Sequence, residues 1–163
     1  MNKKMDISFT SEKGCFRYRA VGIVREDDCI LLAKNHATSY YYSIGGAVKL
    51  NETAEDAVVR EVFEETGINY EIDRLAFIHE NFFVQDSSMN EGFKCHEISL
   101  HFLMKPKGIK ADIKNVSYGE FGYREYCHWI PIKDLDDCIM HPVFYKDRLK
   151  NIGKSIEHII TID

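Results

Sequence analysis

The residues best suited to chemistry lie close together in the middle of the chain, at Glu61, Glu64 and Glu65. In an α-helix, side chains three and four residues apart project from one face, so these three carboxylates should be crowded together. Arg60 and Glu64 form the one helical pair of opposite charge there, and it has the less favourable order. The missing counter-charge indicates a bound cation. Carboxylate and carbonyl oxygens suit Mg²⁺, or Mn²⁺ in its place, better than zinc, which prefers Cys and His.

The segment around these glutamates carries the signals of a helix at 54–66. Thr53 is a suitable N-cap, because its hydroxyl can accept a hydrogen bond from a free backbone N–H of the first turn. Gly67 fits the left-handed position just past the helix end. Upstream, the pair Gly45-Gly46 permits positive φ and a close approach of the backbone to another group. The sequence therefore predicts a glycine loop followed by a helix that presents the glutamates.

The stretch Gly46–Ile68 matches the pattern G-x5-E-x7-R-E-U-x-E-E-x-G-U, with U aliphatic, at every specified position. On this stretch the chain resembles the Nudix hydrolase (MutT-like) family. The resemblance implies an α/β (α+β) fold: an α/β/α sandwich with a mixed β-sheet and a catalytic loop-helix-loop. It also implies a pyrophosphohydrolase that acts on phosphoric anhydride bonds. Its substrate would be a nucleoside triphosphate or another nucleoside-diphosphate-linked molecule, cleaved by metal-activated water.

Carried over by position, the resemblance makes Glu61, Glu64 and Glu65 the Mg²⁺ ligands, with the carbonyl of Gly45 or Gly46 joining them. The same two glycines would form the cofactor-binding loop.

The resemblance also implies supporting roles around this cluster. Arg60 and Glu52 tend to pair and to orient the ligands, and a glutamate accepts the proton of the attacking water. Glu61 and Glu64 are candidates for that base from within the helix. A later loop often supplies a further glutamate, for which Glu120 and Glu125 are the candidates here.

Two positions depart from the family pattern. Ile44 stands where proline is usual, so the loop loses a fixed φ but no ligand. Asn51 stands where glycine is frequent, and asparagine tolerates the left-handed conformation, so the same turn can form.

The bulk composition fits a soluble globular protein that forms a single domain over residues 1–163. Hydrophobic residues make up 45% and charged residues 29%, and the net charge of -5 disfavours non-specific nucleic-acid binding. No apolar stretch is long enough for a secretion signal or a membrane span, so we expect a cytoplasmic protein. Five cysteines without a C-x-x-C pair suit reduced, structural thiols. The oligomeric state stays open, and a homodimer is compatible with the sequence.

The remaining elements are predicted from apolar runs and turn residues. Residues 17–24 and 29–33 should form a hairpin around Glu26-Asp27-Asp28, and 105–119 a solvated connection. Strands are expected within 70–84, at 95–104 and at 128–132, helices at 133–137 and 142–151, and either form at 156–162.

The substrate class is narrowed mainly by the subfamily residues that the sequence lacks. Residues 82–85 carry neither the proline typical of ADP-ribose hydrolases nor the tyrosine typical of diadenosine-polyphosphate hydrolases. A small-molecule nucleotide, such as a nucleoside triphosphate, is the remaining class. The rival hypothesis is a non-catalytic nucleotide-sensing regulator on the same fold, and RNA decapping is a third hypothesis that the acidic balance disfavours.

Several other features have simpler explanations. The aromatic residues near 40–42 and 82–83 favour packing over base stacking, and the lysines at 105–114 favour a solvated loop. His96 and His101 lack the spacing of a helical zinc pair, which favours ordinary hydrogen-bonded histidines.

Overall fold

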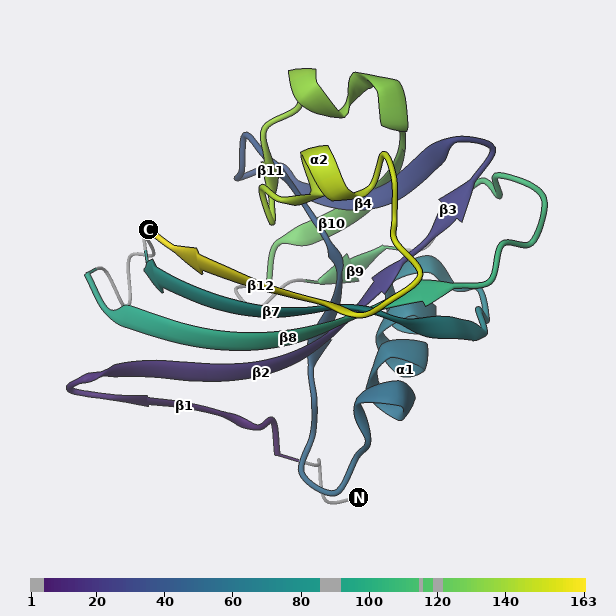
Figure 1. Cartoon of the computed structure of the whole chain (residues 1–163). Helices are drawn as coiled ribbons and strands as arrows, with labels where there is room; N and C mark the ends of the chain where they lie inside the picture. Colours follow the sequence, from purple (N-terminus) through teal and green to yellow (C-terminus); the bar gives the residue numbers. More distant parts are fainter. Residues whose placement is uncertain (1–4, 86–91, 115, 119–121) are drawn as a thin grey trace.

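The computed structural model describes residues 5–85, 92–114, 116–118 and 122–163, and its strands form two six-stranded sheets (Figure 1). The strands of the first sheet are β1 (Ser8–Ser11), β2 (Gly14–Ile23), β6 (Ile44–Ala47), β7 (Ile72–Val84), β8 (Lys94–Met104) and β12 (Glu157–Ile162). Their order is β1-β2-β8-β7-β12, with β6 paired to β2. The strands of the second sheet are β3 (Arg25–Glu26), β4 (Cys29–Asn35), β5 (Tyr41–Tyr42), β9 (Ser117–Tyr118), β10 (Arg124–Pro131) and β11 (Met140–His141). Their order is β11-β5-β4-β10-β9, with β3 paired to β4.

Helices cover the sheets from two sides. Helix α1 (Ala54–Thr66) lies on one side, and the 3-10 helix η1 (Ile132–Asp137) and the short helix α2 (Tyr145–Arg148) lie on the other (Figure 1). Both sheets combine parallel and antiparallel neighbours: β2 runs parallel to β8, while β7 runs antiparallel to it. The expected α/β (α+β) fold of the α/β/α type is therefore confirmed, although the strands form two mixed sheets rather than the single mixed sheet expected. Among the described residues, no helix has the length and apolar character needed to cross a membrane.

The predicted hairpin is only partly correct. Asp27 and Asp28 do form a tight turn with positive φ, but the strand that this turn connects to β4 is the two-residue β3. The longer strand β2 pairs with β1, β6 and β8 instead. The edges of β2 are thus already occupied, so β4 starts a second sheet rather than folding back along it.

The chain after residue 104 also differs in detail from expectation. The predicted helix at 142–151 is only the four-residue α2, and the predicted helix at 133–137 is the 3-10 helix η1. The tail, for which helix and strand were both open, is strand β12, which runs parallel to β7.

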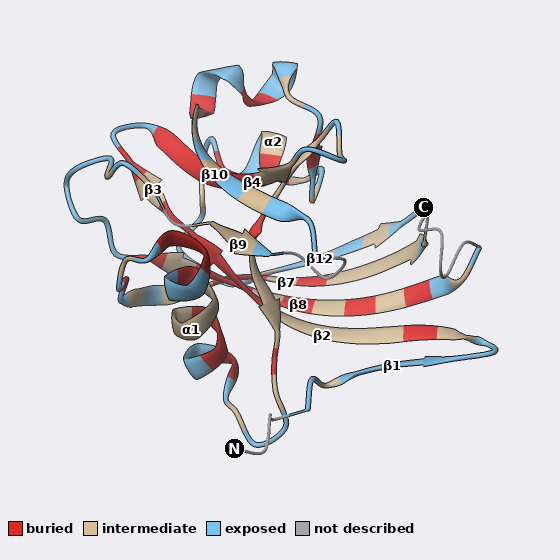
Figure 2. Ribbon diagram, turned by 180° about the vertical axis from the view of Figure 1, so that it is seen from behind, coloured by how far each residue is buried: buried red, intermediate tan, exposed pale blue. Residues whose placement is uncertain are grey.

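The core is divided by the first sheet into two apolar clusters. One packs α1 against β2 and β8 through residues such as Val58, Val62 and Phe102, and the other packs α2 and η1 against β4 and β7. Figure 2 shows buried residues in β4, in α1 and at intervals along β8, whereas β1 is exposed along its length. Gly22 allows the close approach of α1, because a Cβ there would lie 2.4 Å from Cγ2 of Val62.

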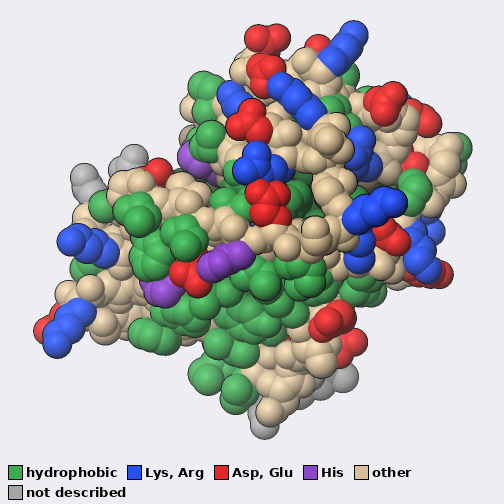
Figure 3. Space-filling model, viewed as in Figure 1, with side chains coloured by type: hydrophobic (Ala, Val, Ile, Leu, Met, Phe, Trp, Pro, Cys, Tyr) green, Lys and Arg blue, Asp and Glu red, His purple; other side chains and the backbone are tan. Residues whose placement is uncertain are grey.

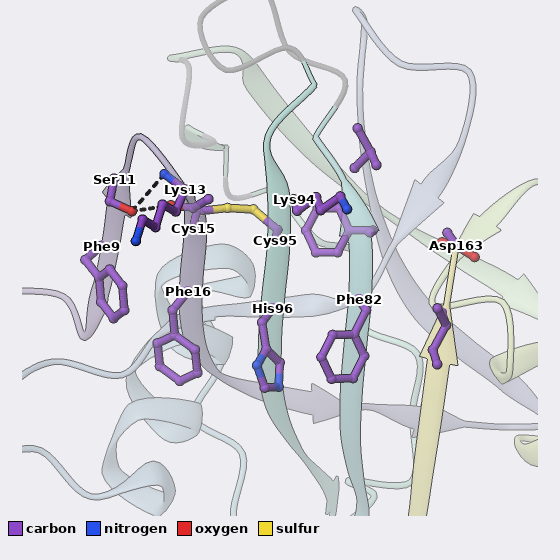
Figure 4. A pocket seen from close by; sticks show the side chains of 14 residues that line it. Phe9, Ser11, Lys13, Cys15, Phe16, Phe82, Lys94, Cys95, His96 and Asp163 are labelled. Atoms are coloured by element: carbon purple, nitrogen blue, oxygen red, sulfur yellow. Dashed lines mark hydrogen bonds between the residues drawn. A yellow bond between two sulfur atoms is a disulfide. The ribbon is translucent and has the colours of Figure 1, made fainter.

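The structure corrects the expectation that the cysteines are all reduced. Cys15 on β2 and Cys95 on β8 are joined by a disulfide, with their Cα atoms 4.6 Å apart (Figure 4). The physical reason is the parallel register, which places these two residues directly opposite each other although 80 positions separate them in the sequence. The three other cysteines are free.

Candidate active site

The helix that carries the glutamates begins and ends as its capping residues predict. The Thr53 hydroxyl accepts a hydrogen bond from Asp56 N at 3.1 Å, which satisfies one of the free N–H groups of the first turn. At the other end Gly67 has φ 73°, and its N–H donates to the Phe63 carbonyl at 2.7 Å. Asn51 has φ 61°, so it adopts the left-handed conformation expected of it.

The glycine loop and α1 hold each other through one buried carboxylate. Gly45, at φ 142°, donates its N–H to Oε1 of Glu65 at 2.7 Å, and Glu65 is 7% exposed. The carbonyl of Gly45 accepts from the Arg19 guanidinium at 2.8 Å. Gly46 lies against Glu61, because a Cβ at this glycine would sit 2.4 Å from Oε2 of that side chain. The loop therefore contacts two of the three glutamates that α1 presents.

Arg60 is the hub of the charged network. It donates to both carboxylate oxygens of Glu52, at 2.8 and 2.9 Å, and to the Ala47 carbonyl at 3.1 Å. It also contacts the carboxylates of Glu61 and, at 3.5 Å, Glu64. The bidentate bond from Arg60 lowers the pKa of Glu52 to about 2. The Arg60–Glu52 pairing expected from the resemblance is present.

Burial works against the charge of the two inner glutamates. Burial raises the pKa of Glu61, the hydrogen bonds from Arg60 oppose this rise, and the charge of Glu64 adds to it. The pKa of Glu65 is raised well above its usual value, first by burial and then by the charges of Glu125 and Glu61, against the opposing N–H of Gly45. Both carboxylates thus lie where an added cation would favour their charged forms.

The carboxylates are not gathered into a ready-made metal cage. Among the described residues, no group of three or more His, Cys, Asp and Glu side chains is arranged to hold a metal ion. The reason lies in the contacts already named: Arg60 engages Glu61 and Glu64, while Glu65 accepts from the Gly45 N–H. The donors nevertheless have the right chemistry for Mg²⁺, since all are oxygens beside a backbone carbonyl.

Of the two later glutamates, Glu125 reaches this region from strand β10. The Tyr42 hydroxyl donates to its Oε1 at 2.8 Å and the Ser117 hydroxyl to its Oε2 at 3.2 Å. The charge of Glu125 is close enough to raise the pKa of Glu65. The second candidate, Glu120, lies outside the described residues.

Two residues near the site escaped the sequence analysis, Arg19 and Glu97, and a third, Tyr42, was expected to serve packing. Glu97, which is 6% exposed, accepts from Arg17 at 2.9 Å and lies 3.9 Å from Arg19. Arg17 and Arg19 are two residues apart on one strand, so their side chains project from the same face. Nothing in the local sequence shows that Glu97 stands opposite Arg17 on the neighbouring strand β8.

A separate hollow opens at the far end of the first sheet and contains none of these residues. Its walls come from β1, β2, β7, β8 and β12, with Phe16, His96 and Phe82 side by side (Figure 4). Since no box residue faces it, this hollow is not part of the candidate active site.

Comparisons with known proteins identify the family of this chain. The family model of the NUDIX domain matches residues 16–151. A MutT-like protein of Streptomyces ambofaciens is 41% identical over 59 residues, which are 36% of this chain and 38% of that protein. The NAD-capped RNA hydrolase NudC of Photobacterium profundum is 53% identical over 47 residues, 28% of this chain and 18% of that protein. The match therefore spans less than two fifths of the length of either relative.

Solved structures show the same fold at low sequence identity. The MutT protein from Methanosarcina mazei Go1 has a TM-score of 0.62 at 20% identity, over 86% of this chain and 94% of that chain. A UDP-X diphosphatase has a TM-score of 0.57 at 12% identity, over 88% of this chain and 66% of that chain. Because the family model covers most of the 163 residues, with the glycine loop and α1 inside the matched range, this chain belongs to the NUDIX domain family.

Proposed function

We propose that this protein hydrolyses a diphosphate bond in a nucleotide substrate with the help of Mg²⁺ or Mn²⁺. The observation that carries the proposal is the junction between the glycine loop and α1. There Glu65 accepts from Gly45 N while Glu61 lies against Gly46. A hard divalent cation requires oxygen ligands of this kind, which here lie next to the backbone of a loop. The bound cation can in turn bind a phosphate group.

Glu61, Glu64, Glu65 and the Gly45 carbonyl are the residues that would hold the metal. When bound, the metal supplies positive charge that draws the phosphate oxygens into the site and makes the phosphorus easier for water to attack. In its absence Arg60 neutralises Glu61 and Glu64, which limits repulsion on this helix face. Arg60 is thus the positioning residue that fixes the carboxylates.

Glu125 and Glu64 are the two candidates to accept the proton of the attacking water. Glu125 is held by the hydroxyls of Tyr42 and Ser117, which fix its orientation. The Glu64 side chain is 53% exposed, so it can reach solvent and a bound substrate. As the general base, either side chain would hold a water within reach of the phosphate.

The substrate class is a small nucleotide with a diphosphate linkage. The names of the similar proteins, MutT-like protein, NAD-capped RNA hydrolase and UDP-X diphosphatase, suggest nucleotides joined to different leaving groups. The net charge of -5 argues against a long polyanion as the main ligand. Arg19 donates to the Gly45 carbonyl, and Arg17, two residues before it on β2, pairs with Glu97, so the positive charge of Arg19 lies beside a group that would hold the metal.

The test is a turnover screen over nucleoside triphosphates, nucleotide sugars, ADP-ribose, dinucleoside polyphosphates, NAD and NAD-capped RNA, with Mg²⁺, Mn²⁺ or a chelator. Glu64→Gln removes one charge from a half-exposed side chain and should lower turnover by at least about tenfold. Glu55→Gln, on an exposed residue of the same helix, should turn over at the wild-type rate.

The rival function, a nucleotide sensor without catalysis, gives a different result in the same screen. It predicts binding of one compound, measured by calorimetry, with no product under any divalent ion. That result would overturn the hydrolase proposal, whereas equal turnover by wild type and Glu64→Gln would remove Glu64 from the mechanism.

A further inference from the structure

The first sheet ends on one side in strand β12, whose outer edge has no partner among the described residues. It pairs with β7 through Glu157–Ile162, and the strand order of the sheet stops there. A free strand edge presents a row of unpaired N–H and C=O groups, which can pair with another chain. In the part of the chain that the structure describes, the other terminal strands are shorter: β1 has four residues, and β9 and β11 have two each.

The sequence of β12 lacks the devices that usually block such an edge. Natural edge strands carry lysines, prolines or bulges that prevent association. Residues 157–162 read Glu-His-Ile-Ile-Thr-Ile and contain none of them. Ile160 is 56% exposed and Ile162 is 78% exposed. The one acidic side chain, Glu157, is already paired with Arg148 at 2.7 Å.

Apolar surface continues from this edge across the neighbouring strands. The sheet register places Ile162 beside Phe82, Phe82 beside His96, and His96 beside Phe16. Figure 3 shows hydrophobic side chains gathered over this face of the molecule, with histidine and acidic side chains among them. Isoleucines that stay exposed next to such a surface are typical of an interaction site.

We propose that β12 pairs antiparallel with β12 of a second copy of this chain, which joins the two first sheets into one continuous sheet. A twofold axis perpendicular to the sheet makes this contact self-complementary and closed. Residues opposite each other must also project from the same face of the joined sheet. The residue numbers of each pair are therefore both even or both odd.

Two registers pair five of the six β12 residues of each copy, one centred on Ile159 and one on Ile160, and charge selects between these two. With Ile160 opposite its own copy, Glu157 would stand opposite Asp163 of the second copy at both ends, and like charges directly opposite destabilise a pair. With Ile159 opposite its own copy, His158 stands opposite Ile160 and no like charges meet. This register also pairs Ile162 with Ile156, which is 55% exposed. We assign the contact to it.

Analytical ultracentrifugation over about 1 to 100 μM protein tests the proposal, because main-chain pairing of this kind depends on concentration. The wild type should move from the 18.9 kDa of one chain towards twice that mass. Ile160→Lys should weaken association by at least tenfold, since lysine blunts an edge and sits beside Glu80 within its own sheet. Ile109→Lys, at a 67% exposed isoleucine far along the chain, is the matched control and should associate as the wild type does.

The register has its own test. Glu80 lies 3.4 Å from His158, so the register is tested in a Glu80→Gln background. There the double variant H158E/I160K places each new glutamate opposite a new lysine of the second copy, and association should recover by about tenfold over Ile160→Lys in the same background. Amide hydrogen exchange at residues 159–162 should slow as the wild-type concentration rises. A wild type that stays monomeric at 100 μM, or a dimer that Ile160→Lys leaves intact, would overturn the β12 contact. Absence of recovery in the double variant would overturn the register.

Discussion

Gly46→Ala should damage the active site while leaving the fold intact. Gly46 has no positive φ, so its backbone accepts alanine without strain. The added Cβ would lie 2.4 Å from Oε2 and 2.5 Å from Cδ of Glu61. An ordinary non-bonded contact is roughly 3.5 Å, so the Glu61 carboxylate must move by about 1 Å.

The size of the effect follows from that displacement. A misplacement of about 1 Å in catalytic machinery costs on the order of 100-fold in rate, which is about 2.7 kcal/mol of transition-state stabilisation. The assay is kcat/KM for the best compound of the substrate screen at saturating Mg²⁺. Mn²⁺ affinity, measured by electron paramagnetic resonance, should fall in parallel. The thermal midpoint should change little, because Glu61 is displaced at the edge of the core rather than within it.

Two further variants make the reasoning refutable. Gly153→Ala adds a Cβ with no atom within 4 Å and should behave as wild type. Combining Gly46→Ala with Glu61→Asp shortens the displaced side chain, so the double variant should lose less activity than the product of the two single losses. Wild-type kcat/KM and Mn²⁺ affinity in Gly46→Ala would show that the position of the Glu61 carboxylate does not matter.

Three other outcomes are expected. Arg60→Lys keeps the charge but loses the bidentate bond to a carboxylate, so kcat should fall by about tenfold while circular dichroism stays unchanged; unchanged kcat would contradict the positioning role. Burial holds the pKa of His101 well below 6.5, so below pH 6.5 the unfolded chain binds a proton that the folded chain does not. The free energy of unfolding, measured by urea titration, should therefore decline by about 1 kcal/mol from pH 6.5 to 5.5 and stay at its full value at higher pH. The decline should be smaller in His101→Asn. Reducing the disulfide between Cys15 and Cys95 opens a loop across 80 positions, so a thiol reductant should cost up to about 4.5 kcal/mol of unfolding free energy, with no reductant effect in the double serine variant.

The sequence predicted the local parts of this molecule well, because local signals determine them. Thr53, Asn51 and Gly67 each act through their own backbone conformation or a neighbour within four residues. The Arg60–Glu52 pair spans eight residues, yet the family pattern contains it. For these features the spacing in the chain was sufficient.

The features that escaped prediction depend on which strands become neighbours. Cys15 and Cys95 look unrelated in the sequence, and only the parallel pairing of β2 with β8 brings them together. The same pairing brings Glu97 to Arg17. A parallel pair needs a long crossover, so no turn signal announces it. The hairpin error has the same origin, since β2 had partners that its own sequence did not reveal.

The absence of a ready-made metal cage among the described residues also has a local cause that the sequence contained. Arg60 precedes Glu61 and stands one turn before Glu64, so its guanidinium can neutralise both. Sequence reasoning treated the glutamates as short of positive charge, whereas the structure shows that one arginine serves three of the four box carboxylates, Glu52 included. A metal must therefore compete with Arg60 for Glu61 and Glu64, and it need not compete for Glu65, whose contact is a backbone N–H.

The packing of α1 on the first sheet therefore determines the geometry of the candidate site. Gly22 lets Val62 approach β2, and Val62 follows Glu61 directly in α1. A side chain at position 22 would push the helix away from the sheet and lengthen the distance from Glu65 to the Gly45 N–H, which is now 2.7 Å. Small residues on β2 and β6 therefore set where the carboxylates lie, although none of them carries a charge.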